Sequence, residues 1–202
     1  MDMDRLARME QAKKVARAEV KKRLEALDAE ERSARSLAAC RRMEEMDAFA
    51  RAAVVMLYVP LPSELDVTSL AQRCLLLEKT LCVPRMDWGE MRMAAIQMDH
   101  FDDRDLRISH GVREPSGGVN VAAKEIDLVV CPGLAFDRLA HRLGRGGGVY
   151  DRFLAQEGFC ASTVGIAFDV QVLDEVPVLG HDIALDAVVT ELRTIIPRGS
   201  ER

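Results

Sequence analysis

The apolar run at residues 52–59 is the feature that most constrains the fold of this chain. It contains no charged side chain, is β-branched at Val54 and Val55, and ends at Pro60. A short continuous run of this kind is typical of a strand buried on both faces, as in parallel sheets whose two sides are covered by helices. The run therefore favours an α/β fold.

The residues that follow predict a helix and a second strand. Residues 66–79 place Leu70, Cys74 and Leu77 on one side of a helix, and residues 80–83 predict a short strand that Pro84 stops. Strand, helix and strand in this order predict a βαβ unit with parallel strands and a right-handed crossover.

The rest of the chain continues this alternation. Helices are expected over residues 4–27, from 28 to about 49 behind an acidic capping box, and over 150–157. Strands are expected over 91–98, 126–131 and 162–168, with a strand or short helix over 183–196 that closes the sheet. Residues 99–120 predict a polar connection of the kind that lines sites.

These elements predict one domain. We expect a single-domain, three-layer α/β/α fold over residues 1–196, with a mostly parallel sheet and two leading N-terminal helices. A frayed tail is expected over residues 197–202.

Composition narrows the class of ligand. The 202 residues are 49% hydrophobic and 30% charged, which supplies a core, and the net charge is −5. A negative chain is poorly suited to bind nucleic acid or an anionic membrane without specificity, so we expect neither partner and favour small molecules. No run approaches the roughly 20 apolar residues of a membrane span. The N-terminal residues mix both charge signs without a signal-peptide core, so a cytoplasmic location is expected. The oligomeric state stays open between a monomer and a weak homodimer.

Cysteine and histidine show no metal or disulfide pattern. The five cysteines form no Cys-x-x-Cys pair, and the four histidines are scattered. Buried reduced thiols are expected rather than disulfides, zinc ligands or a nucleophile.

The glycines mark the chemistry. All 13 lie at or after Gly89, and four of them fall within residues 144–148. The segment 132–151 leaves a predicted strand, crosses a loop with three arginines and enters a predicted helix. Glycines let successive N–H groups point into one concavity, and Arg142 and Arg145 add forked donors suited to phosphate. The alternative is a Gly-rich turn with solvated arginines; four glycines interleaved with arginines favour phosphate binding.

Two common phosphate motifs do not fit this segment. A Walker loop requires Gly-Lys-Ser/Thr before its helix, which is absent here, and Val149 stands where the dinucleotide-binding pattern requires a third glycine.

The segment instead resembles a known family signature. Residues 132–137, Pro-Gly-Leu-Ala-Phe-Asp, and residues 142–151, Arg-Leu-Gly-Arg-Gly-Gly-Gly-Val-Tyr-Asp, closely resemble the signature of the 5-formyltetrahydrofolate cyclo-ligases, also called methenyltetrahydrofolate synthetases. The likeness covers about residues 10–192, with further landmarks in order at 13–17, 62–66, 83–85, 113–115, 165–168, 171, 176–177 and 181–186.

The resemblance implies a reaction. ATP with Mg²⁺ would phosphorylate the formyl oxygen of 5-formyltetrahydrofolate, nitrogen-10 would attack the activated carbon, and phosphate would leave to give 5,10-methenyltetrahydrofolate. ATP and the reduced formylfolate are then the expected partners, with Mg²⁺ as cofactor. Such a transfer needs positioning and charge neutralisation more than a protein nucleophile.

The resemblance also implies roles for individual residues. Arg145 and Tyr150 would be catalytic, and Asp151 and Asp186 would bind Mg²⁺. The implied ATP site comprises Lys13, Arg17, Arg142, Leu143, Gly144, Arg145, Gly146, Gly147, Gly148, Val149 and Tyr150, and the implied folate site comprises Val59, Glu64, Glu114, Arg145 and Val149.

Most of these residues have an ordinary structural interpretation when taken alone. Lys13 and Arg17 would pass as a solvated helix face, Glu64 as a charge that favours the helix dipole, and Asp151 as a helix cap. Asp186 alone carries no signal.

Two positions depart from the family pattern. Gly147 stands where some members carry Lys, which removes a phosphate-facing charge, and Val149 stands where an aromatic residue commonly faces the substrate, which removes stacking area. Two further hypotheses stay open: a paralogue that uses the same ATP site on another formyl or acyl substrate, and a noncatalytic nucleotide-binding module.

Overall fold

A mixed sheet organises the computed structural model, which describes residues 3–197. Within that range the sheet has eight strands: β1 (Val54–Met56), β2 (Thr80–Asp87), β3 (Arg92–Met98), β6 (Asn120–Val121), β7 (Leu128–Cys131), β10 (Ser162–Ile166), β11 (Ala187–Val189) and β12 (Thr194–Ile195). Their spatial order is β12-β11-β10-β7-β1-β2-β3-β6. The central strands from β11 to β2 are parallel, and antiparallel strands extend the sheet on both sides.

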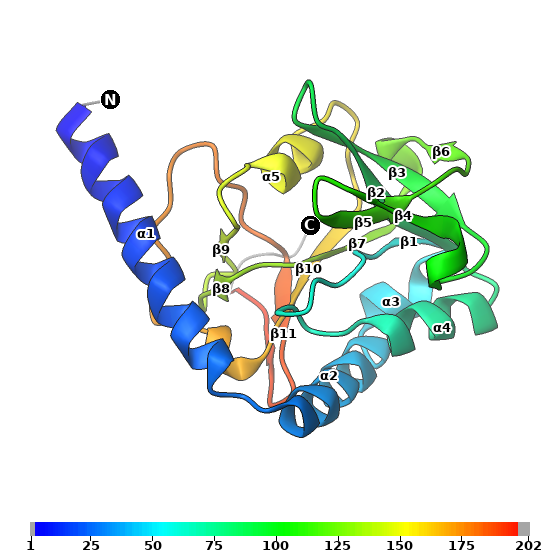
Figure 1. The fold of residues 1–202 in the computed structure, drawn as a ribbon, viewed down its shortest axis with the longest axis horizontal. Coiled ribbons are helices and arrows are strands. Elements are labelled where there is room, and N and C mark those ends of the chain that lie inside the picture. The colour runs from blue at the N-terminus through cyan, green and yellow to red at the C-terminus, as the bar shows by residue number, and fades with distance from the viewer. Residues whose placement is uncertain (1–2, 198–202) are drawn as a thin grey trace.

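Helices cover both faces of this sheet (Figure 1). On one face lie α1 (Met3–Glu25), α2 (Ala29–Glu44), α3 (Asp47–Arg51) and α4 (Thr68–Leu76), and on the other lies α5 (Val149–Leu154). Val20, Met43 and Leu70 from the first group are buried in one core cluster, whereas Phe153 and Leu154 of α5 belong to a second cluster. The predicted three-layer α/β/α fold with two leading helices is confirmed.

Strand β1 is buried on both faces, as its apolar run predicts. Val55 packs into the core cluster of the first face, and Met56 packs into the cluster of the second. The pairing of β1 with both β7 and β2 is parallel, so the predicted βαβ unit forms through α4. The strand is shorter than 52–59, and the residues beyond its carboxyl end carry Tyr58 and Val59 out of the sheet.

The strand expected to stop at Pro84 was wrongly bounded. β2 runs through Pro84 to Asp87 and pairs with β3 from Leu81 to Asp87. Pairing between β2 and β1 extends only to Cys82, so a proline at position 84 breaks no bond to β1.

The helix expected from residue 28 to about 49 is also divided. Asp28 caps α2 through the predicted capping box, with Glu31 N donating to its Oδ1 at 2.8 Å. The helix then ends at Glu44, and extended backbone at Met46 precedes α3.

Two hairpins occupy segments that looked irregular in sequence. Residues 99–120 contain β4 (Leu106–Ser109) paired with β5 (Val112–Pro115), and the residues between β7 and α5 contain β8 (Ala135–Phe136) paired with β9 (Arg142–Leu143). The tip of the first is His110 and Gly111, both with positive φ, as a two-residue hairpin turn of type I′ requires. Histidine is a weak signal for such a turn, so the sequence did not predict it.

The C-terminal end of the chain was expected to close the sheet and then to form a tail. Within residues 183–196, β11 and β12 confirm the strand alternative, but these strands cover only residues 187–189 and 194–195. Except for Pro197, the tail expected over residues 197–202 lies outside the described residues, and the domain boundary at residue 196 stays a prediction.

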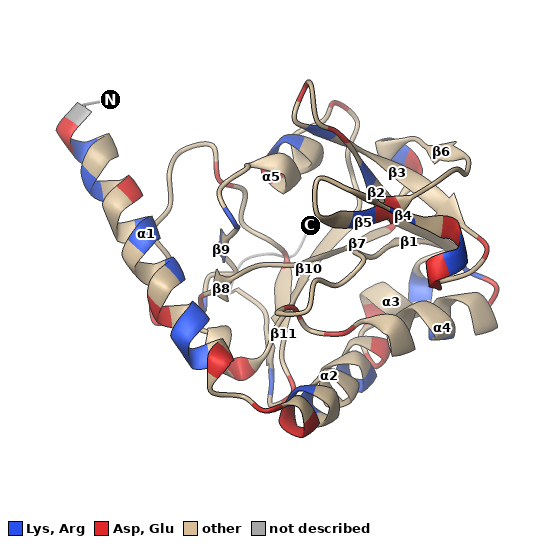
Figure 2. Cartoon of the chain, in the orientation of Figure 1, with Lys and Arg blue, Asp and Glu red and all other residues tan. Residues whose placement is uncertain are grey.

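Among the described helices, none combines the length and apolar character needed to cross a bilayer. Lys and Arg outnumber Asp and Glu along α1, and both signs are present on α2 (Figure 2).

Gly165 in β10 provides a test of the core packing. A Cβ at this position would lie 2.5 Å from Phe136 Cε1 and 3.1 Å from Leu185 Cδ1, inside the second core cluster. Gly165→Ala is therefore expected to lower the free energy of unfolding by about 1–3 kcal/mol in urea denaturation. Gly117→Ala, where a Cβ meets no atom within 4 Å, is the control and should leave stability nearly unchanged. Equal stability of the two variants would show that Phe136 moves aside at no cost.

Candidate active site

A cavity of about 300 Å³ lies beside the carboxyl ends of β1 and β7. Tyr58 and Val59 follow β1, and Pro132 and Gly133 follow β7, and all four line the cavity. Ligands of parallel α/β sheets bind at this edge. The segment after β1, the β2–β3 hairpin, β5, β9, the Gly-rich loop and the start of α5 complete the lining with Leu61, Glu64, Pro84, Met86, Trp88, Met91, Met93, Val112, Arg113, Glu114, Arg142, Gly144, Arg145, Gly147, Gly148, Val149, Tyr150 and Asp151.

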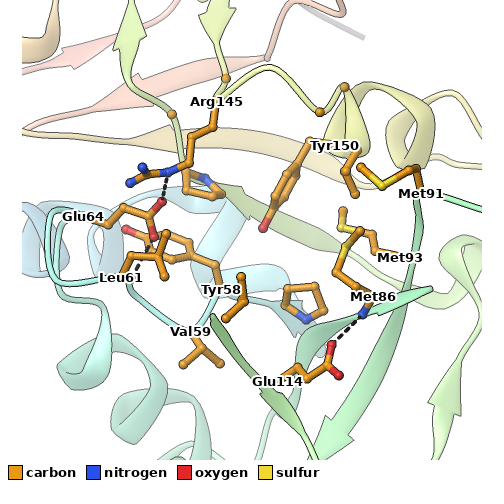
Figure 3. A pocket seen from close by; sticks show the side chains of 18 of the residues that line it. Tyr58, Val59, Leu61, Glu64, Met86, Met91, Met93, Glu114, Arg145 and Tyr150 are labelled. Atoms are coloured by element: carbon orange, nitrogen blue, oxygen red, sulfur yellow. Dashed lines mark hydrogen bonds and ion pairs between the residues drawn. The ribbon is translucent and has the colours of Figure 1, made fainter. Parts of the chain in front are cut away.

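The cavity has a polar end and an apolar end (Figure 3). Arg145 and Glu64 lie at the polar end, and Met91 and Met93 lie at the other. Tyr150 stands between them. A ligand with a charged part and a flat apolar part matches this division.

The Gly-rich loop, residues 144–148, is held from two sides. Arg17 of α1 donates from Nε to Gly144 O at 2.9 Å, so the first helix contacts the loop; its predicted role in binding ATP stays a prediction. Arg152 of α5 donates to Gly147 O at 2.7 Å and to Met91 O at 2.7 and 3.0 Å. Gly146 and Gly148 have φ of 115° and 59°, a backbone region that disfavours other residues. The loop is thereby fixed to both α1 and the β2–β3 hairpin.

An ion pair joins the predicted ATP site to the predicted folate site. Arg145 donates from Nε to Glu64 Oε1 at 3.0 Å and from Nη2 to Ser63 Oγ at 2.9 Å. Glu64 Oε2 accepts from Leu61 N at 3.0 Å, which fixes the carboxylate. The Arg145 side chain is 46% exposed, whereas that of Glu64 is 13% exposed, so the arginine is the more readily displaced partner.

A second ion pair joins Arg142 to Asp151. Arg142 Nη2 donates to Asp151 Oδ2 at 2.9 Å, and its guanidinium lies 5.3 Å from the centre of the Tyr150 ring. Ile183 N donates to Asp151 Oδ1 at 3.3 Å. The Arg142 side chain is only 4% exposed, and its buried Nε has no hydrogen-bond partner within the described part of the chain. The structure therefore brings together a predicted phosphate-binding residue and a predicted Mg²⁺ ligand.

Some predicted site residues lie away from the cavity. Lys13 Nζ donates to Asp182 Oδ2 at 2.5 Å, and Asp186 Oδ2 accepts from both the N and Oγ1 of Thr163 at 2.8 Å. Leu143 is buried in β9, and neither it nor Gly146 lines the cavity. The roles of these residues stay predictions.

Glu114 lines the cavity but is already engaged. It is 1% exposed, and it accepts from Met86 N and from Arg107 Nη2, each at 3.2 Å. These contacts satisfy the carboxylate and tie β5 to β2, so Glu114 has less capacity for a ligand than Glu64.

The two tyrosines of the cavity are protonated donors at neutral pH. Burial raises the pKa of Tyr58 and of Tyr150 well above the ordinary value. Tyr58 donates to Leu65 O at 2.7 Å and is thereby fixed in the wall.

The cysteines are unreactive where they are buried. Burial raises the pKa of Cys40 to about 11 and the pKa values of Cys74, Cys82 and Cys131 to about 12. The expectation of reduced thiols is confirmed for all five cysteines, and the expectation of burial is confirmed for these four but wrong for Cys160, which is exposed.

Sequence reasoning missed the apolar wall of the cavity. The wall includes Trp88 and Met91 from the tip of the β2–β3 hairpin, and Arg152 of α5 bonds Met91 O. No sequence signal places this hairpin tip beside the Gly-rich loop. The Asp-Trp-Gly-Glu tetrapeptide at 87–90 is a turn signal that could have indicated the hairpin itself.

Residues 9–191 match the model of the 5-formyltetrahydrofolate cyclo-ligase family. The chain is 27% identical over 190 residues to a 5-formyltetrahydrofolate cyclo-ligase of Mus musculus, which covers 89% of this chain and 94% of the relative. It is 32% identical over 155 residues to the protein of that name in Mycolicibacterium smegmatis, covering 70% and 75%.

Two solved structures are similar to this chain over most of its length. The 5,10-methenyltetrahydrofolate synthetase of Aquifex aeolicus matches with a TM-score of 0.79 at 30% identity, covering 92% of this chain and 93% of that one. The synthetase of Mycoplasma pneumoniae shares the fold, with a TM-score of 0.72 at 19% identity over 89% and 98% of the two chains.

Proposed function

This chain belongs to the 5-formyltetrahydrofolate cyclo-ligase family, and we propose that it converts 5-formyltetrahydrofolate to 5,10-methenyltetrahydrofolate with ATP and Mg²⁺, releasing ADP and phosphate. One observation carries the proposal: the Gly-rich loop, Arg145, Glu64 and an apolar wall all line the same cavity. Phosphate-binding groups and a ring-sized surface thus border the same space.

Phosphate binding would fall to the Gly-rich loop and its arginines. Arg145 is exposed enough to turn from Glu64 toward a phosphate, and Arg17 supports the loop from α1. Arg142, which also lines the cavity, would add a second guanidinium charge beside the loop. These donors would balance the charge that moves to the formyl oxygen and to the leaving ADP during phosphoryl transfer.

Folate binding would use the remainder of the cavity. Glu64 offers a fixed carboxylate to the N–H groups of the pterin, which would replace Arg145 as its partner. Tyr150, a phenol whose pKa burial raises further, is protonated at neutral pH and can donate to the formyl oxygen or to the phosphate that forms on it. Nitrogen-10 then closes the ring on the activated carbon as phosphate leaves.

Mg²⁺ would bind beside Asp151, where it would replace Arg142 as the partner of the carboxylate. Mg²⁺ in nucleotide sites takes one or two protein carboxylates together with phosphate oxygens and waters. Asp151 lines the cavity, and the described residues contain no cluster of three His, Cys, Asp or Glu that would form an all-protein cage. Bound there, Mg²⁺ would neutralise phosphate charge. Asp186, which is bonded to Thr163 and does not line the cavity, stays a weaker proposed ligand.

The proposal also covers the cellular location and the oligomeric state of the protein. We propose a cytoplasmic monomer or weak homodimer without nucleic acid or membrane partners. The net charge of −5 supports the absence of a nucleic acid partner. A relative of 30% identity in Arabidopsis thaliana carries the description mitochondrial.

A direct assay tests the reaction. Purified protein with ATP, Mg²⁺ and 5-formyltetrahydrofolate is expected to produce the methenyl chromophore, and omission of ATP or addition of EDTA should abolish it. A folded protein that gives no absorbance change would contradict the proposal.

Val149, an aliphatic residue in the cavity lining, motivates a second candidate, a paralogue that uses the same ATP site on another formyl or acyl substrate. Turnover with another formyl or acyl compound, but none with formylfolate, would support this second candidate.

A further inference from the structure

Trp88, the single tryptophan of the chain, lies at the tip of the β2–β3 hairpin and lines the cavity. Its Nε1 donates to Ser109 Oγ at 3.1 Å, and its ring stands 4.5 Å from the ring of His110 with an interplanar angle of 31°. Both partners belong to the tip of the β4–β5 hairpin. The indole is therefore held on two sides before any ligand arrives.

The hairpin that carries Trp88 is itself fixed. Asp87 Oδ1 accepts from Gly89 N and Glu90 N at 2.9 and 3.1 Å, which shapes the turn. On the far side of the turn, Arg152 bonds Met91 O and Gly147 O together. An aromatic ring held by this many contacts loses little conformational entropy when it contacts a ligand.

The wall around Trp88 is apolar. Met86, Met91 and Met93 line the cavity from the same hairpin. A Cβ at Gly147 would lie 3.7 Å from Met91 Cε and 3.3 Å from Val149 Cγ2, so the hairpin and the start of α5 form one surface. Glu114, the carboxylate that lines the cavity from β5, is occupied by Met86 N and Arg107.

This wall selects one part of a reduced folate. The pterin edge is rich in N–H donors and suits the Glu64 end, whereas the p-aminobenzoyl ring is a flat arene without such an edge. Methionine sulfur and an indole face are favourable neighbours for an arene. We propose that Trp88 is a specificity-determining residue that stacks on the p-aminobenzoyl ring of the formylfolate; the inference rests on the proposed function and names the subsite for this ring.

Fluorescence of Trp88 provides a readout without turnover. Because no other tryptophan contributes, p-aminobenzoylglutamate is expected to change the emission of the wild-type protein saturably, and ATP analogues with Mg²⁺ alone should not. N-acetyltryptophanamide in the same titration corrects for absorbed light. A change of emission with the nucleotide analogue would overturn the inference. So would the absence of a change with either probe.

Kinetics of matched variants provide the second readout. Trp88→Leu is expected to raise KM for formylfolate about 10-fold without changing KM for ATP, and Trp88→Phe, which keeps a ring, should raise it less. Ser109→Ala, which removes the Nε1 acceptor, should give a smaller rise of the same kind. Phe101→Leu is the control: Phe101 packs against the core outside the cavity, and its loss should affect stability alone.

The outcomes separate this inference from the proposed function. Saturable binding of p-aminobenzoylglutamate without methenyl formation would uphold the ring subsite while the reaction fails. Normal turnover with an unchanged formylfolate KM in Trp88→Leu would leave the reaction intact and refute the role of Trp88. Equal KM changes in Trp88→Phe and Trp88→Leu would also refute stacking, because the retained ring would then make no difference.

Discussion

Replacing Arg145 by Ala is expected to lower kcat for methenyl formation by about 10²- to 10³-fold, the usual loss when one preorganised donor to a developing anion is removed. Arg145 stands in the Gly-rich loop with a half-exposed side chain, tied to Glu64 and Ser63. Its guanidinium can therefore move to a phosphate without unfolding its surroundings. Steady-state kinetics with ATP and formylfolate varied in turn measure the effect.

Glu64→Gln is the matched variant for this prediction. It removes the same ion pair but keeps the guanidinium, so kcat should fall far less while KM for formylfolate rises. Arg145→Lys should recover only part of the activity, because lysine keeps the charge but loses the forked geometry. Equal losses in Arg145→Ala and Glu64→Gln would show that the two residues act only through their mutual bond, and exchanged effects on ATP and folate would reverse the assignment of the two subsites.

Replacing Asp151 by Ala is expected to lower the free energy of unfolding by about 3 kcal/mol, even without ligands. The change leaves the guanidinium of Arg142, whose side chain is 4% exposed, without its carboxylate partner. Removing one member of a buried ion pair leaves an uncompensated charge, which costs more than the pair itself contributes. Urea denaturation of the ligand-free protein measures the loss.

A double variant separates the stability of Asp151→Ala from its chemistry. Arg142→Met combined with Asp151→Ala removes both charges and should recover much of the stability, but not turnover. Asp151→Asn keeps the shape of the side chain and should raise the Mg²⁺ concentration needed for half-maximal rate. Wild-type stability in Asp151→Ala would mean that Arg142 finds another partner, and unchanged Mg²⁺ dependence in Asp151→Asn would remove Asp151 from the metal site.

Local patterns predicted the parts of the fold that depend on local forces. The apolar run around Val55 marked a strand buried on both faces, and Asp28 with Glu31 marked the start of α2. Burial and capping act over a few residues, so their signals are legible in sequence. The β4–β5 hairpin was missed because His110 adopts a positive φ that histidine seldom signals, and β2 was cut short because only the tertiary pairing shows that Pro84 lies past the contact with β1.

The sequence by itself determined the α/β class, the position of the Gly-rich loop after a buried strand, and the family to which the chain belongs. Only the tertiary structure decided how the side chains of that site meet. Arg145 lies 81 positions from Glu64, and Trp88 contacts Ser109 from a different hairpin. The physical reason is that such contacts depend on how the sheet edge brings separate loops to one cavity, where side chains compete for partners. A loop sequence records which groups are available and leaves their partners to the packing of the whole chain.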